Sequence, residues 1–276
     1  MFLDKEKRIT KRKVPLKIAI KKSLSDPRRV VLFLMEQTRL HQNKKNSQKI
    51  GVLSNRVKLD TDEFCEKIVF ERPTYEEIEL VSTTYDTLLE KVRIAYSNVT
   101  DGNGFSIIST EDAKAIYWIV RISKPRVIVE TGVSDGMSTS IILSALHRNG
   151  EGLLYSIDLP DVGMPQLIDQ KPGWLVEDRI RDKWVLSLGD SKKILPDLCK
   201  RVGKVDIFLH DSEHSYENMS FEFNTVYSYM SKEGVLLSDD SFGNDAVLDF
   251  AAKIGINYDK VAFSKQGLAG IRILKS

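Results

Sequence analysis

The sequence has few cysteines and no long apolar segment, and both absences narrow the classes of protein it can encode. Cys65 and Cys199 are its only cysteines among 276 residues, too few for a disulfide framework and without the spacing of a zinc site. The longest apolar run near the N-terminus, residues 30–35, is far shorter than the ~20 residues of a membrane-spanning helix. The first residues are charged and lack the apolar core of a secretory signal. We therefore expect a cytoplasmic protein with no transmembrane segment.

Extremes of composition are also missing, although the charge is unevenly distributed. Hydrophobic residues make up 42% of the chain, with 16 Gly and 8 Pro, which excludes collagen-like and wholly disordered chains. The net charge is +2, yet residues 1–60 hold 17 Lys and Arg against 5 Asp and Glu. Such a basic N-terminal arm either binds phosphate on nucleic acid or an anionic membrane surface, or is a solvated or subunit-contacting arm.

Residues 61–108 form a second expected unit, a helical cap or oligomerisation segment. Thr74 and Glu77 have the spacing of a capping box, which predicts a helix over residues 74–96. Apolar residues then recur at alternating steps of three and four: Ile78, Val81, Tyr85, Leu88, Val92 and Ala95. This spacing places one apolar seam on the helix. The seam packs on the main domain or, as the alternative, joins subunits of a homo-oligomer.

Residues 109–276 alternate short apolar runs with helical stretches. The expected strands are 126–130, 152–158, 184–188, 205–210, 234–238, 259–263 and 267–274. A helix begins at Thr110, and others cover 137–148, 190–201 and 215–231, the last with a buried stripe of Met219, Phe223, Val226 and Met230. The pattern predicts an α/β fold with a doubly wound, mostly parallel seven-stranded sheet and a helical N-terminal extension.

Ligands of a doubly wound sheet bind outside the carboxyl ends of its strands, so the residues after each run are the candidates. The first run leads into a turn with the order Glu130-Thr-Gly132-Val-Ser134-Asp-Gly136-Met-Ser138. Its glycines permit close approach of a ligand, and the following helix start suits a carboxylate. The spacing is not the G-x-G-x-x-G of dinucleotide-binding turns, which counts against the alternative of a nucleotide-linked oxidoreductase.

Two aspartates follow the second and third runs. Asp158 is placed to accept both hydroxyls of a ribose, or else it stabilises a turn. Asp190, between Gly189 and Ser191, contacts a purine amino group, caps the next helix, or does both.

Acidic residues also follow the fourth and fifth runs. If these strands are neighbours, Asp211 faces Asp239 and Asp240, and such carboxylates repel one another unless a cation or protons neutralise them. Oxygen ligands favour a hard ion such as Mg²⁺. His214, three residues after Asp211, is placed to act as a general base in the same pocket. The plain alternative is that Asp239 or Asp240 caps a helix near residue 243 and that His214 is a surface residue.

Taken in order, these elements resemble the class I S-adenosylmethionine-dependent methyltransferases. The resemblance rests on the glycine turn, Asp158, the Gly-Asp-Ser at 189–191, His-Asp-Ser-Glu-His-Ser-Tyr-Glu at 210–217 and Ser-Asp-Asp at 238–240. It is strongest to the metal-dependent branch that includes catechol and natural-product sugar O-methyltransferases, and it covers about residues 105–276. Ser134 stands where many of these enzymes have Gly, and Asp239-Asp240 where relatives have Glu-Asp or Asp-Asn.

The resemblance implies a role for each matching residue. The residues around the methionine part of S-adenosylmethionine would be Glu130, Gly132, Ser134, Gly136 and Ser138. Asp158 would hold the ribose, and Gly189, Asp190 and Ser191 the adenine. Asp211, Asp239 and Asp240 would bind Mg²⁺, with Asp211 and His214 catalytic. The expected activity is O-methylation of a small-molecule or saccharide acceptor; the alternative is a catalytically altered relative whose arm binds nucleic acid or membrane.

Overall fold

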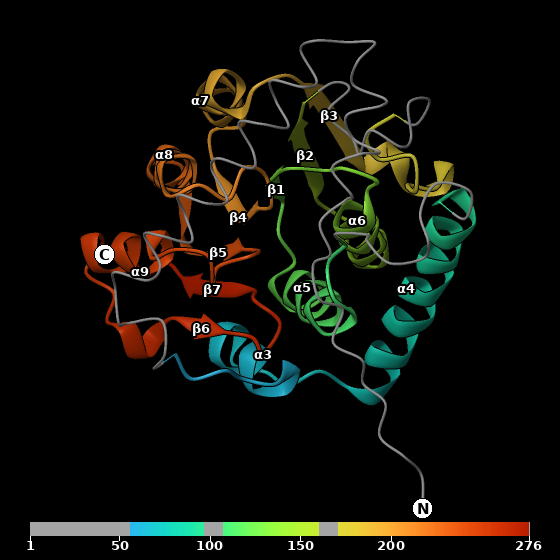
Figure 1. Ribbon diagram of the computed structural model, residues 1–276, viewed down its shortest axis with the longest axis horizontal. Coiled ribbons are helices and arrows are strands. Elements are labelled where there is room, and N and C mark those ends of the chain that lie inside the picture. Colours follow the sequence, from blue (N-terminus) through green and yellow to red (C-terminus); the bar gives the residue numbers. More distant parts are fainter. Residues whose placement is uncertain (1–55, 97–106, 160–170, 276) are drawn as a thin grey trace, which may run out of the picture.

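The computed structural model describes residues 56–96, 107–159 and 171–275 (Figure 1). Most of the predicted basic arm, up to residue 55, therefore lies outside the described residues, as does the turn-rich segment 97–106. Within the described ranges, no helix combines the length and apolar character needed to cross a membrane.

A seven-stranded sheet forms the centre of the molecule, with the strand order β3-β2-β1-β4-β5-β7-β6. The strands are β1 (Val127–Thr131), β2 (Leu153–Asp158), β3 (Trp184–Leu188), β4 (Val205–His210), β5 (Met230–Ser238), β6 (Ala262–Phe263) and β7 (Ala269–Arg272). The first five strands pair in parallel, and β7 is antiparallel to both β5 and β6. The predicted doubly wound, mostly parallel sheet is confirmed.

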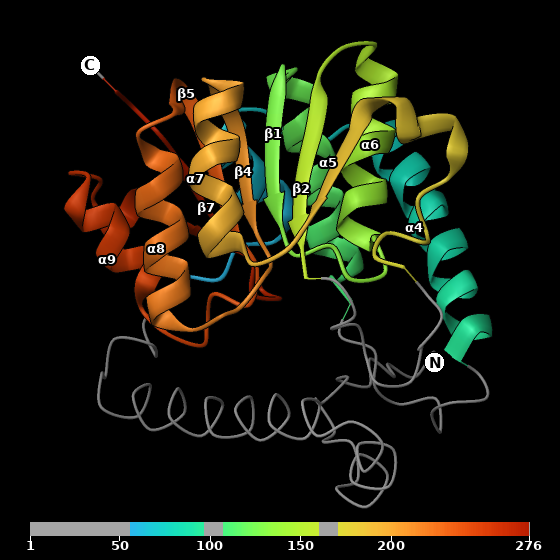
Figure 2. The same ribbon diagram turned by 90° about the horizontal axis from the view of Figure 1, so that it is seen from above.

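Helices cover both faces of this sheet (Figure 2). They are α3 (Thr61–Val69), α4 (Tyr75–Tyr96), α5 (Thr110–Ser123), α6 (Met137–Asn149), α7 (Ser191–Val202), α8 (Tyr216–Tyr227) and α9 (Ala246–Lys253), with short 3₁₀ helices η2 (Asp178–Lys183) and η3 (Tyr258–Lys260). Side chains of α3 to α6 share one apolar cluster and those of α7 to α9 another. Successive strand residues such as Ile128 and Val129 point into opposite clusters, as expected for strands buried on both faces.

The apolar seam of α4 lies against α5 and α6. Val81, Leu88 and Val92 are buried there, so the seam is used within the chain and the alternative of a subunit contact gains no support. Only half of the predicted capping box forms. Thr74 accepts a hydrogen bond from the Glu77 backbone N–H at 3.4 Å, but the Glu77 carboxylate turns instead to Arg121 on α5.

The structure corrects several predicted boundaries. The helix expected over residues 215–231 ends at Tyr227, and Met230 is the first residue of β5, where it pairs with Val205. Residues 258–260 form a 3₁₀ turn rather than the start of a strand. Helix α3 was not predicted individually, and α9 was expected only in the alternative that placed a helix near residue 243. Because α9 begins at Ala246 with Asp245 as its N-cap residue, neither Asp239 nor Asp240 caps it.

Candidate active site

The carboxyl ends of β1 and β4 touch at Gly132. A Cβ atom on this residue would lie only 2.1 Å from the carbonyl oxygen of Asp211, and its φ of +86° is in the left-handed region. The Asp211 N–H donates to the Thr131 carbonyl at 2.8 Å, which holds the two chain segments together. Only glycine fits here, so the predicted glycine turn and the first of the predicted metal ligands are parts of one site.

Glu130 and Ser138 meet beneath this turn. The Glu130 carboxylate is fully buried and accepts hydrogen bonds from Ser138 at 2.8 Å, from Thr139 at 2.8 Å and from Ser156 at 2.7 Å. Burial raises the pKa of Glu130 to about 7, against the lowering effect of these hydroxyl groups. The Glu130 carboxylate therefore connects the start of α6 to β2. The Ser138 hydroxyl, which the sequence analysis placed beside the ligand, points inward and donates to Glu130.

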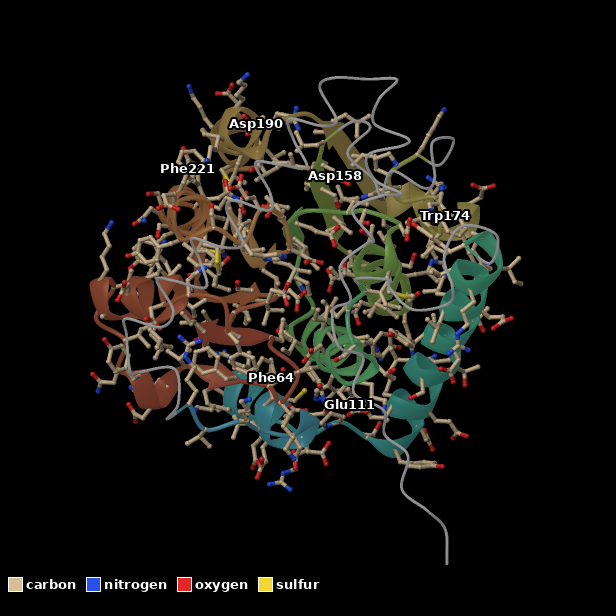
Figure 3. The ribbon with its side chains drawn as sticks, viewed as in Figure 1. Phe64, Glu111, Asp158, Trp174, Asp190 and Phe221 are labelled. Atoms are coloured by element: carbon tan, nitrogen blue, oxygen red, sulfur yellow. The ribbon has the colours of Figure 1, made fainter. Side chains whose placement is uncertain are left out.

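Asp158 lies at the end of β2, beside the glycine turn, and Asp190 at the start of α7 (Figure 3). The Asp158 carboxylate accepts from the backbone N–H groups of Ser134 and Leu159, both at 2.8 Å, and burial raises its pKa. Ser134 has a φ of 51°, a conformation that favours glycine, and its bond to Asp158 helps to hold it there. Asp190 caps α7 by accepting from the Lys192 N–H at 2.9 Å.

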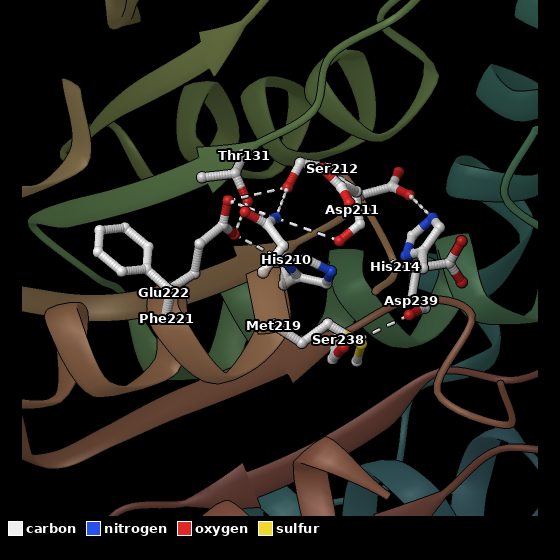
Figure 4. Close-up of polar contacts among 12 residues, drawn as sticks. Thr131, His210, Asp211, Ser212, His214, Met219, Phe221, Glu222, Ser238 and Asp239 are labelled. Atoms are coloured by element: carbon white, nitrogen blue, oxygen red, sulfur yellow. Dashed lines mark hydrogen bonds and ion pairs between the residues drawn. The ribbon is translucent and has the colours of Figure 1, made fainter. Parts of the chain in front are cut away.

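The predicted carboxylates at the ends of β4 and β5 converge, because these strands are neighbours (Figure 4). One ligand atom from each of Asp211, His214 and Asp239 lies within 4.8 Å of the other two. The Nε2 atom of His214 is 3.8 Å from an oxygen of Asp211 and 3.8 Å from an oxygen of Asp240. We call Asp211, His214, Asp239 and Asp240 the carboxylate corner.

The electrostatics of the carboxylate corner suit a divalent cation. Burial raises the pKa of Asp211 well above its usual range, and the negative charges of Asp239, Glu130 and Asp240 raise it further. A bound cation would remove this repulsion by supplying the opposite charge. The donors are carboxylate oxygens with one imidazole, a set that fits Mg²⁺ or Mn²⁺.

The sequence model of a family described as a methyltransferase domain matches residues 129–241. Across these residues the chain is similar in sequence to that family. The match runs from β1 to the residue after Asp240, so it contains the glycine turn and the whole carboxylate corner. No curated protein matches the chain in sequence.

Solved structures share the fold at low sequence identity. The methyltransferase PaMTH1 of Podospora anserina is 16% identical, with 74% of this chain and 98% of that chain covered at a TM-score of 0.53. The O-methyltransferase NovP is 18% identical, with coverages of 72% and 98% and a TM-score of 0.52. TomG from Streptomyces achromogenes is 18% identical, with coverages of 67% and 89% and a TM-score of 0.50. The predicted class I methyltransferase fold is confirmed.

A buried carboxylate within the matched residues 129–241 is not among the predicted site residues. Glu222 on α8 accepts from Thr131 at 2.6 Å and from Ser212 at 2.9 Å, and lies 2.7 Å from Nδ1 of His210. Burial raises its pKa, but the bonds and charge from its partners, above all His210, outweigh this and lower the pKa to about 2. Glu222 lies among the apolar residues of α8, and no sequence pattern singles it out.

Asp135 was also missed, although it is part of the glycine turn. Its carboxylate accepts from the hydroxyl of Tyr96 and from Nε1 of Trp174, both at 2.8 Å. The backbone N–H of Gly173 donates to the Ser134 carbonyl at 2.8 Å. The turn is thus held from outside by the end of α4 and by the segment that leads to η2. These partners are distant in sequence, so only the fold reveals them.

Proposed function

We propose that this protein is an S-adenosylmethionine-dependent O-methyltransferase that acts on a hydroxyl group of a small-molecule or saccharide acceptor. The observation that carries the proposal is the carboxylate corner, which lies directly against the glycine turn of a methyltransferase domain through the Gly132–Asp211 contact. In the crystal structures that share the fold, PaMTH1 is bound to SAH and TomG is in complex with SAM. NovP and TomG are both described as O-methyltransferases.

In this proposal the cofactor lies along the carboxyl ends of β1, β2 and β3. The glycine turn, with the residues Glu130, Gly132, Ser134, Gly136 and Ser138, surrounds its methionine part. Asp158 binds the ribose, and Gly189, Asp190 and Ser191 the adenine. The hydrogen bond from the Gly189 N–H to the Asp158 carbonyl, 2.7 Å long, supports this arrangement because it places the two segments side by side.

The chemistry follows from the carboxylate corner. When bound, the cation held by Asp211, Asp239 and Asp240 would lower the pKa of the acceptor hydroxyl, and the sulfonium cofactor would supply an activated methyl group. His214 accepts the hydroxyl proton on Nε2, the atom 3.8 Å from both Asp211 and Asp240. The nearby carboxylates stabilise the imidazolium that results. The remaining contribution of the chain is to hold acceptor and methyl donor in line.

Calorimetric titration of S-adenosylmethionine and its demethylated product, with and without Mg²⁺, tests cofactor and metal together. We expect both compounds to bind the wild-type protein, and we expect Mg²⁺ to bind with an affinity that Asp211→Asn lowers strongly. Asp197→Asn is the matched control, because Asp197 is an exposed aspartate on α7 away from the carboxylate corner.

Failure to bind either compound would reject the assignment and favour the alternative of a catalytically altered methyltransferase-like protein. Salt-dependent binding of nucleic acid or anionic vesicles, lost on deletion of residues 1–55, would then identify the basic arm as the functional part. Binding of the cofactor with turnover unaffected by chelator or by Asp211→Asn would remove only the metal from the proposal.

A further inference from the structure

The last residues of the N-terminal arm run along the edge of the sheet. The Leu59 N–H donates to the Phe263 carbonyl at 2.8 Å, and the Lys265 N–H donates to the Leu59 carbonyl at 3.0 Å. Leu59 and Ser264 form a parallel bridge. Residues 56–60 are therefore fixed beside β6, at the carboxyl-end side of the sheet where β5 leads into the carboxylate corner.

The side chain of Arg56 extends from this segment into the interior of the molecule. Its side chain is only 4% exposed and lies over the ring of Phe263, 4.9 Å from the ring centroid. The guanidinium donates to the carbonyl oxygens of Ser241 at 2.6 Å and Asn244 at 3.2 Å, and it forms an ion pair with Asp245. A buried charge is costly unless it is paired and hydrogen-bonded, so these partners bind Arg56 to the loop of residues 241–245.

The same loop holds two members of the carboxylate corner. The Gly243 N–H donates to the Asp240 carbonyl at 3.2 Å, and the side-chain amide of Asn244 donates to the His214 carbonyl at 3.0 Å. Hydrogen bonds therefore run from Arg56 through the loop to the backbones of Asp240 and His214. Asp240 has a φ of 49°, a conformation that its surroundings must maintain.

We propose that Arg56 is a positioning residue for the reaction, which holds Asp240 and His214 in place through the loop of residues 241–245. The inference rests on the function proposed above and adds to it a contribution from the N-terminal extension. Lys58, whose amine lies 4.5 Å from the ring centroid of Phe242 in the same loop, adds a second contact between the extension and the loop. The methyltransferase domain alone thus lacks one support of its carboxylate corner.

The test compares Arg56→Met and Arg56→Lys with a matched control, Arg272→Met. Arg272 makes the same kinds of contact, with the Ile68 carbonyl at 3.2 Å, Glu233 at 2.7 Å and the Phe70 ring at 4.9 Å. It pairs with Val235 within β5, however, and its partners Ile68, Glu233 and Phe70 all lie outside the loop of residues 241–245.

Mn²⁺ affinity, S-adenosylmethionine affinity and kcat are measured for each variant. We expect Arg56→Met to weaken Mn²⁺ binding by roughly tenfold or more and to lower kcat, while cofactor affinity changes less than about twofold. Arg56→Lys restores the charge without the forked geometry, so it should give intermediate values. Arg272→Met should leave all three quantities at the wild-type level.

A nuclear magnetic resonance measurement separates this inference from the proposed function. The chain has four histidines, so the ring signal of His214 can be assigned by its loss in His214→Gln. If wild-type protein binds no Mn²⁺, the metal part of the proposed function fails. The positioning role is still supported if Arg56→Met shifts the His214 signal and Arg272→Met does not. Asp245→Asn weakens the same ion pair from the loop side and should also shift the His214 signal. It takes the place of Arg56→Met if Arg56→Met does not fold.

An unchanged His214 signal together with unchanged Mn²⁺ affinity in the Arg56 variants would overturn the inference. Equal losses in Arg56→Met and Arg272→Met would overturn it as well, because they would indicate general destabilisation of the sheet edge.

Discussion

The Nδ1 atom of His210 lies 2.7 Å from the Oε2 atom of Glu222, and both side chains are fully buried next to the carboxylate corner. Glu222 also accepts from Thr131 and Ser212, so it joins the ends of β1 and β4 to α8. A carboxylate with this many donors is stabilised in its charged form, which explains its low pKa.

We expect Glu222→Gln to lower the free energy of unfolding by about 3 kcal/mol at pH 7, because it breaks a buried charged network. The folded-state pKa of about 2 lies below the ordinary pKa of a glutamate, ~4.3. The stabilisation by Glu222 is therefore complete above the ordinary pKa and is lost as the pH falls toward 2. Urea unfolding from pH 7 to pH 3 should show the difference from wild type shrinking. Glu217→Gln, at an exposed site on α8, is the control, and a difference that stays constant with pH would contradict the assignment.

Replacement of Gly132 tests the contact between the glycine turn and β4. Gly150→Ala isolates the cost of a positive φ, since nothing lies within 4 Å of its Cβ position. That cost is about 1 kcal/mol. Gly132→Ala adds overlap with the Asp211 carbonyl, so we expect about 3 kcal/mol more destabilisation in urea unfolding. Equal costs for the two variants would show that the turn and the strand can separate freely.

Without a bound metal ion, we expect wild-type protein to be less stable than its Asp211→Asn variant, because the carboxylate corner brings negative charges together. In the presence of chelator we expect Asp211→Asn to raise Tm by about 2 °C or more, because it removes one of the repelling carboxylates. Added Mg²⁺ should raise the Tm of wild type and leave that of Asp211→Asn unchanged. Differential scanning calorimetry measures both effects, with Asp197→Asn as the control. A variant less stable than wild type in chelator would mean that the repulsion is already relieved.

The contact between α4 and α5 depends on Glu77, which accepts from Arg121 at 3.0 Å and Tyr117 at 2.8 Å. Burial raises the pKa of Glu77, but these donors outweigh it and hold the pKa below its usual value. Glu77→Gln should therefore cost about 1 to 2 kcal/mol at pH 7, and the cost should vanish as the pH falls through the lowered pKa. Unfolding measurements and faster hydrogen exchange in α4 check this. Glu79→Gln, at an exposed position on the same helix, should have no effect.

Local sequence patterns predicted the sheet well. The bounds expected for β3 and β4 agree with the structure, since each is a short, mostly apolar run between turn residues. The rule that ligand residues follow parallel strands also predicts that Asp211 lies beside Asp239, as the structure has them. The predictions failed where tertiary pairing sets the boundary. Met230 continues a helical stripe in sequence, but its pairing with Val205 draws it into β5.

The amino-acid sequence by itself determined the α/β class and the succession of strands and helices along the chain, because these follow from hydrophobic periodicity. It also determined the glycine turn and the acidic residues of the site, because these follow from the residue types at strand ends. Only the tertiary structure decided that Glu222 joins β1, β4 and α8 and that Arg56 reaches the loop of residues 241–245. Arg56 and Ser241 are separated by 185 residues along the chain. No local sequence pattern links residues so far apart. Their contact arises only when the chain folds and the segment beside the edge strand β6 comes to lie against the loop that follows β5.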